Sequence, residues 1–323
     1  MAKKKLKIGI LFGGKSAEHE ISIISARNII KSLNKDKYQI FPIKIDRNGK
    51  FNLNSLKKVD VIFPVLHGPF GEDGSMQGLL KILNIPFVGP SVLGSAVSMD
   101  KDVTKRLLKD AGILIGKFIT LKVGEKISFE KVKKTLGLPV FIKPANMGSS
   151  VGISKVQNEK EWAKAIKAAF LYDSKIVIEE NINGQEIECS VLGNEKPIAS
   201  IPGEIVPIDD FYSYKAKYIR KNGAELLIPA RLSKDIIKKV QDIAIKVFKA
   251  LNCEGMGRVD FFVKKNGKIF VNEINTIPGF TAISMYPKLW KASGLPLSKL
   301  LDKLVDLAIE RFKKESKLRT AVK

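Results

Sequence analysis

The chain has 323 residues and a formal net charge of +23. Of its residues, 45% are hydrophobic and two are cysteines. That size suffices for about two domains with a real core. No apolar run approaches the ~20 residues of a membrane span, so we expect no membrane partner. Cys189 and Cys253 lack metal-binding spacing, so we expect a reduced, cytoplasmic protein. The excess charge is nearly all scattered lysine without a zinc-finger, RNP or helix-turn-helix pattern, so we expect no nucleic-acid partner and keep a basic nucleic-acid-binding protein only as a remote alternative.

The N-terminal residues predict a repeated strand and helix pattern. Residues 6–12 are an apolar strand, Gly13 and Gly14 form a tight turn, and Ser16 is expected to cap a helix. Further strands at 39–45, 59–64 and 86–88 indicate a doubly wound parallel sheet over residues 1 to about 95. Glu18 and His67 lie where such sheets bind ligands, although Glu18 alone is also explained as a solvated first-turn carboxylate and His67 as a structural histidine.

Residues 9–16, GILFGGKS, match the P-loop pattern letter for letter. In a true P-loop the first glycine follows the strand, whereas Gly9 lies inside the predicted strand and leaves too short a loop to surround phosphates. We therefore reject a phosphate site here.

The next segment predicts a second unit, with helices at 101–111 and 159–169 and strands at 139–143, 152–156 and 175–179. The connection PANMGSSVG at 144–152 is rich in small residues that expose backbone N–H groups, which favours a flap over phosphates with Lys143 as a point charge. An ordinary solvent loop is the alternative. After the last strand, residues 180–182 offer backbone groups for adenine, and Glu186 is placed for ribose hydroxyls or is a simple turn acid.

The C-terminal part predicts a hairpin that interrupts apolar strands with polar residues. Period-two alternation on both sides of a turn at 264–268 brings Asp260, Glu273 and Asn275 together with Arg258. Three oxygen donors without Cys or His suit Mg²⁺ bridged to phosphates, although a solvated sheet face is the competing interpretation. Gly279, just after the hairpin, allows backbone N–H groups to approach a ligand closely.

The segment at 202–223 is long and rich in Tyr and Lys, which predicts a lid that excludes water. Helices are expected at 235–251 and 297–312.

Seven blocks in order resemble the D-alanine-D-alanine ligases of the ATP-grasp superfamily: GGKSAEHE at 13–20, LHGPFGEDG at 66–74, SMDK at 98–101, IKPANMGSSVG at 142–152, YKAKY at 214–218, GRVD at 257–260 and NEINTIPGFT at 272–281. The likeness runs from about residue 6 to 312. It implies an α/β fold, α+β in the ATP-grasp part, in which a doubly wound parallel N-terminal sheet precedes two subdomains that grip ATP between sheets. The expected domains are 1–97, 98–183 and 184–323, the last with the metal site and lid.

The resemblance also implies roles for individual residues. ATP would be held by Lys101, Lys143, Glu179, Glu180, Asn181, Ile182, Glu186 and Lys217. Two Mg²⁺ or Mn²⁺ ions would be bound by Asp260, Glu273 and Asn275. The catalytic set would be Glu18, Ser149, Tyr218, Arg258 and Gly279, and the substrate-binding set Glu18, His67, Ser284 and Met285.

The implied reaction joins two D-alanine molecules through an acyl phosphate for peptidoglycan synthesis, in a homodimer. His19 replaces the arginine that many relatives carry, and Met147 and Met285 stand where leucine or another residue is common; none of these is a predicted metal ligand. Tyrosine at the Tyr218 position accompanies dipeptide synthesis in the family, so D-alanine is the expected second substrate. A D-alanine-D-lactate or D-alanine-D-serine ligase is the alternative.

Overall fold

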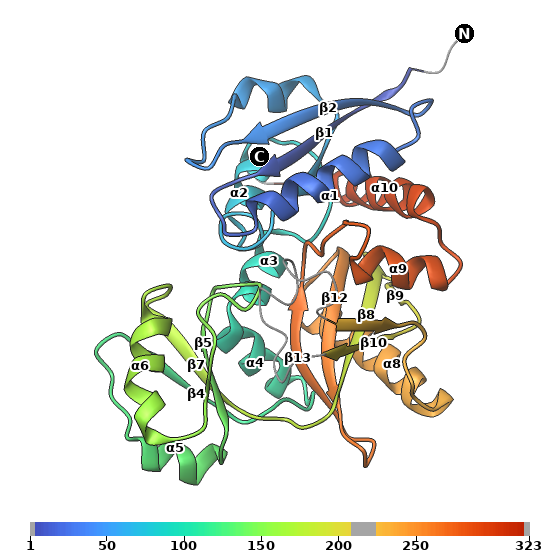
Figure 1. Ribbon diagram of the computed structural model, residues 1–323. Helices are drawn as coiled ribbons and strands as arrows, with labels where there is room; N and C mark the ends of the chain where they lie inside the picture. The colour runs from blue at the N-terminus through green and yellow to red at the C-terminus, as the bar shows by residue number, and fades with distance from the viewer. Residues whose placement is uncertain (1–3, 208–223, 320–323) are drawn as a thin grey trace.

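A computed structural model describes residues 4–207 and 224–319 of the chain. These residues form three sheets, and Figure 1 shows the N-terminal sheet at the top, a four-stranded sheet at the lower left and the largest sheet at the lower right. The N-terminal sheet is parallel and the other two are antiparallel. The predicted α/β fold class, with a parallel N-terminal sheet followed by two further sheets, is confirmed.

The N-terminal sheet has the strand order β2-β1-β3, from β1 (Leu6–Gly13), β2 (Tyr38–Ile45) and β3 (Val61–Val65). Its central strand is a nearly continuous apolar run, as expected of a parallel strand covered on both faces. The helices of this region are α1 (His19–Ser32), the 3₁₀ helix η1 (Leu53–Lys58), α2 (Ser75–Ile82) and α3 (Val92–Met99). The strand predicted at 86–88 is reduced to an isolated bridge between Ile62 and Phe87.

The turn after β1 differs from the prediction in one respect. Helix α1 begins at His19 and Glu18 occupies its N-cap position, so Ser16 is not the cap. Instead, Ser16 Oγ accepts a hydrogen bond from the Glu18 N–H at 3.2 Å. Gly13 is required here because its φ is +96° and a Cβ would lie 2.2 Å from the Ile45 carbonyl oxygen.

Two hydrophobic clusters cover the two faces of this sheet. On one face, β1 and β3 pack with α1, α9 (Met285–Ala292) and α10 (Leu297–Glu315), and Figure 1 shows α10 beside α1. On the other face, Leu11 and Ile62 pack with side chains of η1 and α2. The first core therefore contains residues from both ends of the sequence.

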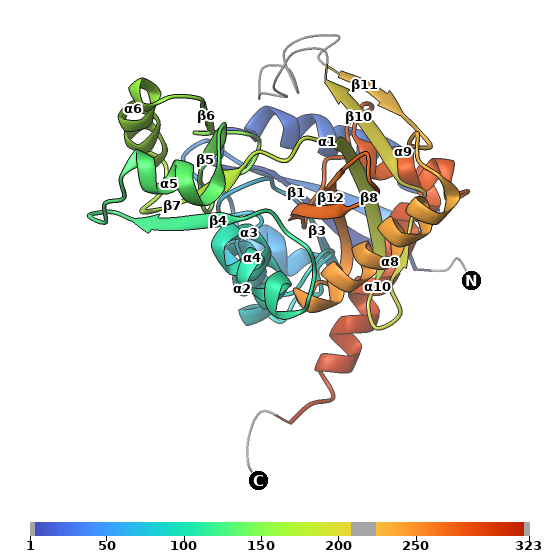
Figure 2. The ribbon, with the colours of Figure 1, turned by 90° about the horizontal axis from the view of Figure 1, so that it is seen from below.

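The second sheet has the order β4-β7-β5-β6, from β4 (Phe118–Lys122), β5 (Val140–Pro144), β6 (Ser154–Val156) and β7 (Lys175–Glu180). Helix α4 (Lys101–Asp110) precedes it, and α5 (Phe129–Leu136) and α6 (Glu159–Phe170) pack against it, as Figure 2 shows. The sequence analysis predicted β5, β6, β7, α4 and α6 but neither β4 nor α5.

The third sheet has the order β11-β10-β8-β12-β13, with β9 (Ile198–Ala199) paired to β8. Its strands are β8 (Gln185–Gly193), β10 (Gly203–Pro207), β11 (Ala224–Leu227), β12 (Gly255–Val263) and β13 (Ile269–Asn275), and α8 (Lys234–Ala250) packs on it. Part of the stretch predicted as one long loop is therefore strand. The aromatic and lysine residues of the predicted lid, including Lys217 and Tyr218, lie outside the described residues.

The predicted domain boundary at 183/184 falls between β7 of the second sheet and β8 of the third, whereas the boundary at 97/98 falls within α3. The partition itself stays a prediction. None of the helices in the ranges 4–207 and 224–319 is long and apolar enough to cross a membrane.

Candidate active site

A cleft of about 420 Å³ lies between the second and third sheets. Strands β5 and β7 and the 147–150 loop line one side, and β12 and β13 line the other. Its lining includes the described residues that the sequence analysis assigned to ATP: Lys101, Lys143, Glu179, Glu180, Asn181, Ile182 and Glu186. Ser149 and Glu273 also line this cleft.

Glu179 is the centre of a buried charge cluster in the cleft. Its carboxylate accepts from Lys143 Nζ at 2.8 Å and lies 3.4 Å from Lys105 Nζ, whose side chain is only 3% exposed. Burial alone would raise the pKa of Glu179, but the two lysines lower it to about 2. Lys101, one turn before Lys105 on α4, also lowers the pKa of Glu179, so three lysines lie around this one carboxylate.

Lys105 was not predicted as a site residue from the sequence. The available signal was its spacing of four residues from Lys101, which puts both side chains on one face of α4.

The connection from β7 to β8 forms one end of the cleft. Glu180 Oε1 accepts the Lys117 N–H at 2.8 Å, and the Glu180 N–H donates to the Lys117 carbonyl at 3.0 Å. These bonds fix the connector against the segment before β4. Asn181 and Ile182 follow at the cleft, and the Ile182 side chain packs closely on Gly116, where a Cβ would lie 2.9 Å from Ile182 Cδ1.

The predicted flap is folded against the N-terminal part of the chain. Lys101 Nζ donates to the Met147 carbonyl at 2.5 Å, and Ser149 Oγ donates to Glu18 Oε1. Ser149 has a φ of +52°, and a Cβ on Gly148 would lie 3.3 Å from Glu18 Oε2. The flap thus joins the cleft to the edge of the N-terminal sheet.

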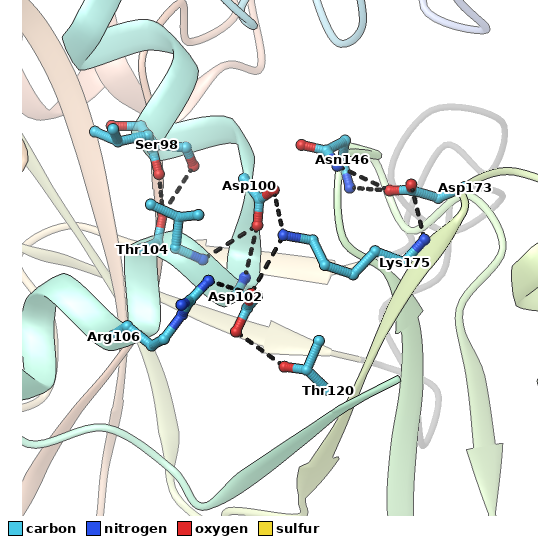
Figure 3. Close-up of polar contacts among 11 residues, drawn as sticks. Ser98, Asp100, Asp102, Thr104, Arg106, Thr120, Asn146, Asp173 and Lys175 are labelled. Carbon is cyan, nitrogen blue, oxygen red and sulfur yellow. Dashed lines mark hydrogen bonds and ion pairs between the residues drawn. The ribbon is translucent and has the colours of Figure 1, made fainter. Parts of the chain in front are cut away.

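Figure 3 shows the polar network that anchors α4 and the start of the flap. Asp100 caps α4 by accepting from the N–H groups of Asp102 and Val103, and Lys175 Nζ of β7 binds the carboxylates of Asp100 at 2.6 Å and Asp102 at 3.3 Å.

At the base of the flap, Asp173 accepts from the Asn146 backbone N–H at 2.7 Å and from its side-chain amide at 3.0 Å. Lys101, the residue after the α4 cap, is held from the same side because its N–H donates to the Ala145 carbonyl at 3.0 Å. The network therefore sets Lys101 and the flap relative to the second sheet.

At the N-terminal edge, His67 and Glu72 are buried. His67 Nδ1 lies 2.9 Å from the Ile277 carbonyl oxygen, so Nδ1 carries the proton, and burial lowers the pKa of His67. Its Nε2 is then an acceptor, and this buried atom has no hydrogen-bond partner within the described ranges.

Glu72 was not singled out from the sequence, although it lies in the glycine-rich HGPFGEDG motif. Its two carboxylate oxygens accept the N–H groups of Gly68 at 2.7 Å and Ile277 at 2.9 Å. Burial first and the charge of Glu18 second raise the pKa of Glu72 to about 7, against these hydrogen bonds.

The predicted metal hairpin is formed as expected, with Asp260 opposite Glu273 and Arg258 opposite Asn275 across β12 and β13. Asp260 pairs with Glu273 and the next residue, Phe261, pairs with Val271, so Asn272 is an extra residue and marks a bulge in β13. Asn275 Nδ2 donates to Asp260 Oδ2 at 3.0 Å. The described residues contain no cluster of three or more His, Cys, Asp and Glu side chains arranged for a metal, but two carboxylates and an amide oxygen are the donor types that Mg²⁺ prefers, so the residues fit this ion.

Arg258 is held between two carboxylates. It binds Asp260 through Nε at 2.8 Å and Nη2 at 2.7 Å, and its Nε lies 2.8 Å from Glu188 Oε2 of β8. Burial disfavours its charge, but Asp260 and Glu188 raise the pKa of Arg258 well above its ordinary value. The sequence analysis missed Glu188, which pairs with Asp260 across β8 and β12.

Gly279 and Ser284 lie close together in the segment after β13, since a Cβ on Gly279 would meet Ser284 Oγ at 2.8 Å. Ser284 Oγ accepts the Thr281 N–H at 2.9 Å and is the N-cap of α9. The Met285 side chain is buried with Ile205 and Leu289 under β10 and β11. The Met285 side chain therefore does not line an open site, and its backbone forms the first turn of α9.

The arrangement combines a cleft with a buried lysine cluster, an oxygen-donor hairpin and a buried arginine. The chain matches the family models described as D-ala D-ala ligase N-terminus, over residues 7–58 and 51–90, and D-ala D-ala ligase C-terminus, over residues 107–306. Among curated proteins, it is 50% identical to a D-alanine–D-alanine ligase of Oceanobacillus iheyensis, covering 98% of this chain and 99% of the relative.

Solved structures give the same likeness. The D-alanine-D-alanine ligase of Coxiella burnetii has a TM-score of 0.88 at 41% identity and matches 98% of this chain and 97% of its own. The VanG D-Ala:D-Ser ligase of Enterococcus faecalis has a TM-score of 0.86 at 38% identity, and the match covers 94% of this chain and 100% of that one. The D-alanine–D-alanine ligase of Bacillus anthracis complexed with ATP has a TM-score of 0.82 at 32% identity, and the match covers 96% of this chain and 99% of that one.

Proposed function

This chain belongs to the D-alanine-D-alanine ligase family, and from that premise we propose how its residues perform the ligation. The chain is an ATP-dependent ligase that joins two D-alanine molecules for peptidoglycan synthesis. The observation that carries the assignment of residues is that Glu273 of the hairpin lines the same cleft as Lys101 and Lys143. Ser149, at the same cleft, binds Glu18 at the edge of the N-terminal sheet.

In the first step, a carboxylate oxygen of one D-alanine attacks the γ-phosphorus of ATP. The bond between that phosphorus and the β,γ-bridging oxygen breaks, and ADP leaves with the electron pair, which produces an acyl phosphate. Lys101 and Lys143 bind phosphate oxygens, and Lys217, which lies outside the described residues, is proposed as a third cation. The adenosine lies against Glu179, the connector at 180–182, and Glu186.

Asp260, Glu273 and Asn275 would hold two Mg²⁺ or Mn²⁺ ions, which when bound neutralise the charge on the phosphates. The protein contributes the rest of the electrostatics. Arg258 stays cationic beside Asp260 and Glu188, and its guanidinium is proposed to face the oxygen on which negative charge develops.

The first D-alanine is proposed to bind at the edge of the N-terminal sheet. Its ammonium group pairs with the Glu18 carboxylate and donates to His67 Nε2, the buried acceptor that has no partner in the described part of the chain. Because Nδ1 of His67 already donates to Ile277, the imidazole is fixed in the tautomer that this contact requires. This gives His67 a specific substrate-binding role.

In the second step, the neutral amine of another D-alanine attacks the acyl carbonyl carbon. The tetrahedral intermediate then breaks its carbon–oxygen bond to the phosphoryl group, and phosphate leaves with the electron pair. The amine nitrogen loses a proton to the departing phosphate, which gives the peptide bond and hydrogen phosphate. The Gly279 N–H and Arg258 stabilise the oxyanion, and Ser284 with the Met285 N–H binds the second carboxylate. Tyr218, outside the described residues, is proposed to join the Ser149 and Glu18 bridge.

A homodimer in the cytoplasm is part of this proposal, supported by the family resemblance. The test is phosphate release from ATP and Mg²⁺ with and without D-alanine, followed by identification of the product. D-alanine-dependent phosphate with an equal amount of D-alanyl-D-alanine is the expected result, and salt-dependent retention on DNA without phosphate release would contradict it.

The likeness to the D-Ala:D-Ser ligase of Enterococcus faecalis favours one second candidate, a ligase that accepts D-serine. Competition between D-alanine, D-serine and D-lactate for the second position separates the candidates. We expect D-alanine to be preferred at neutral pH.

A further inference from the structure

We propose that Ser25 and Asn28 of α1 are positioning residues, which together with His67 and Glu72 fix the Gly279 amide for the second step of the ligation. This inference rests on the proposed role of Gly279 as an oxyanion donor. It goes beyond that role because it assigns the alignment of the donor to side chains of the N-terminal part, more than 200 residues away in the sequence.

The segment from Ile277 to Phe280 is held at its first residue from two sides. The Ile277 N–H donates to Glu72 Oε1 at 2.9 Å, and the Ile277 carbonyl accepts from His67 Nδ1 at 2.9 Å. Both partners lie in the connection between β3 and α2 and are buried. The peptide groups of Ile277 therefore cannot rotate without breaking a buried hydrogen bond.

The last residue of the segment is held in the same way by α1. The Phe280 N–H donates to the buried Ser25 Oγ at 3.1 Å, and Asn28 Nδ2 donates to the Phe280 carbonyl at 2.6 Å. Ser25 and Asn28 are three residues apart and lie on one face of the helix. One rigid element thus satisfies both backbone groups of Phe280.

Side chains anchor the segment as well. Ile277 and Phe280 are buried in the core that β1, β3, α1 and α10 share. The Phe280 ring meets Phe63 edge to face, with centroids 5.7 Å apart and planes at 88°, and lies 5.7 Å from the Tyr286 ring. Burying two such side chains fixes the ends of the segment more strongly than hydrogen bonds alone.

Gly279 lies between these two anchors and is the one residue of 276–281 that is not fully buried. Its neighbour Pro278 has no N–H, so Gly279 supplies the N–H between the anchored peptides of Ile277 and Phe280. A donor held in this way needs no reorganisation when an oxyanion forms, which is the condition under which oxyanion stabilisation is most effective. The clamp also joins the donor to the first substrate's site, since Glu72 Oε2 binds the Gly68 N–H beside Glu18.

The experiment compares the two chemical steps in the full-length protein. Positional isotope exchange in ATP labelled at the β,γ-bridging oxygen, with D-alanine and Mg²⁺, reports reversible formation of the acyl phosphate. Dipeptide formation reports both steps. The variants are Asn28→Asp, which keeps the shape but cannot donate to the Phe280 carbonyl, and Ser25→Ala; the matched control is Arg27→Ala, the exposed neighbour on α1.

We expect Asn28→Asp and Ser25→Ala to lower kcat for the dipeptide by about tenfold or more, because a misaligned oxyanion donor loses part of its contribution. Isotope exchange and the KM for ATP should stay within about twofold, and Arg27→Ala should change none of these quantities. Wild-type dipeptide formation in both variants would overturn the proposal. A parallel loss of exchange and dipeptide with a lowered melting temperature would also overturn it, since that pattern indicates a structural role alone. If the wild-type chain itself makes no dipeptide, the proposed function fails, and the two failures are thereby distinguished.

Discussion

Replacing Lys105 by methionine tests whether the buried charge cluster prepares the cleft for ATP. Lys105 Nζ lies 3.4 Å from Glu179 Oε1, and at an effective dielectric constant of about 20 two unit charges at this distance attract by roughly 5 kcal/mol. Repulsion from Lys143 and the desolvation of Lys105 offset part of this attraction. Removing one partner of a buried ion pair costs roughly 3–5 kcal/mol, and we take about 3 kcal/mol because Glu179 keeps Lys143 at 2.8 Å.

That loss should be visible in both stability and ATP binding. A change of about 3 kcal/mol should lower the melting temperature of a chain of this size by roughly 5 °C. If half of this free energy is lost from the binding of the triphosphate, the KM for ATP rises by about tenfold, while kcat changes less. The matched control is Lys109→Met, which removes an exposed lysine one turn further along α4. Thermal unfolding and initial rates at varied ATP measure both effects.

An unchanged KM for ATP in Lys105→Met would refute the electrostatic reasoning, whatever happens to the melting temperature. An equal effect of Lys109→Met would refute it too, because general loss of positive charge would then explain the result.

Four further predictions concern the metal site, the flap, Glu72 and the lid. Glu273→Ala should abolish turnover while circular dichroism stays unchanged, and substantial remaining activity would disprove its role as a metal ligand. Ser149→Ala removes the hydrogen bond to the Glu18 carboxylate, worth about 1.5–3 kcal/mol, so kcat/KM for D-alanine should fall about 10- to 100-fold in steady-state assays. The pKa of Glu72 is raised from 4.5 to about 7 in the folded state, so the proton on this carboxyl stabilises the folded state fully below pH 4.5. The free energy of unfolding should therefore fall by roughly 3 kcal/mol as the pH rises from about 4.5 to 7. Denaturant unfolding at several pH values should show a smaller loss in Glu72→Gln, and an identical pH profile would contradict the assignment. Tyr218→Phe should weaken the preference for D-alanine over D-lactate in competition assays, and an unchanged ratio would count against its role in acceptor choice.

Local patterns were sufficient to predict the hairpin and most of the strands around the cleft. Alternation at period two placed Asp260 opposite Glu273 because register follows from the pleat and the turn. The reason for rejecting the P-loop match is confirmed, since Gly9 lies within β1. Strand β4 was not predicted. It lies at the edge of its sheet, where three of its five side chains are only half buried, so the alternation of apolar and polar residues is weak.

The contacts that the sequence did not predict join residues far apart in the chain. In the sequence, Lys105 and Glu188 are typical residues of a helix and a strand. Only the tertiary structure brings Lys105 to Glu179 and Glu188 to Arg258. Glu72 reaches Ile277 across 205 residues, and spacing along the chain carries no signal for such a pair. Burial of charged groups is likewise set by tertiary packing, so the raised pKa of Glu72 and the lowered pKa of Glu179 could not be anticipated.

The core shared by β1, β3 and α10 constrains the order in which the chain matures during synthesis. Leu300, Leu304 and Val305 of α10 complete the packing of one face of the N-terminal sheet, yet they are translated long after that sheet. At about 5–20 residues per second, the ribosome needs roughly ten to fifty seconds to reach them after β3 emerges. During that interval an apolar face of the nascent sheet is open to chaperones, and fragments that stop before α10 should depend on them for solubility.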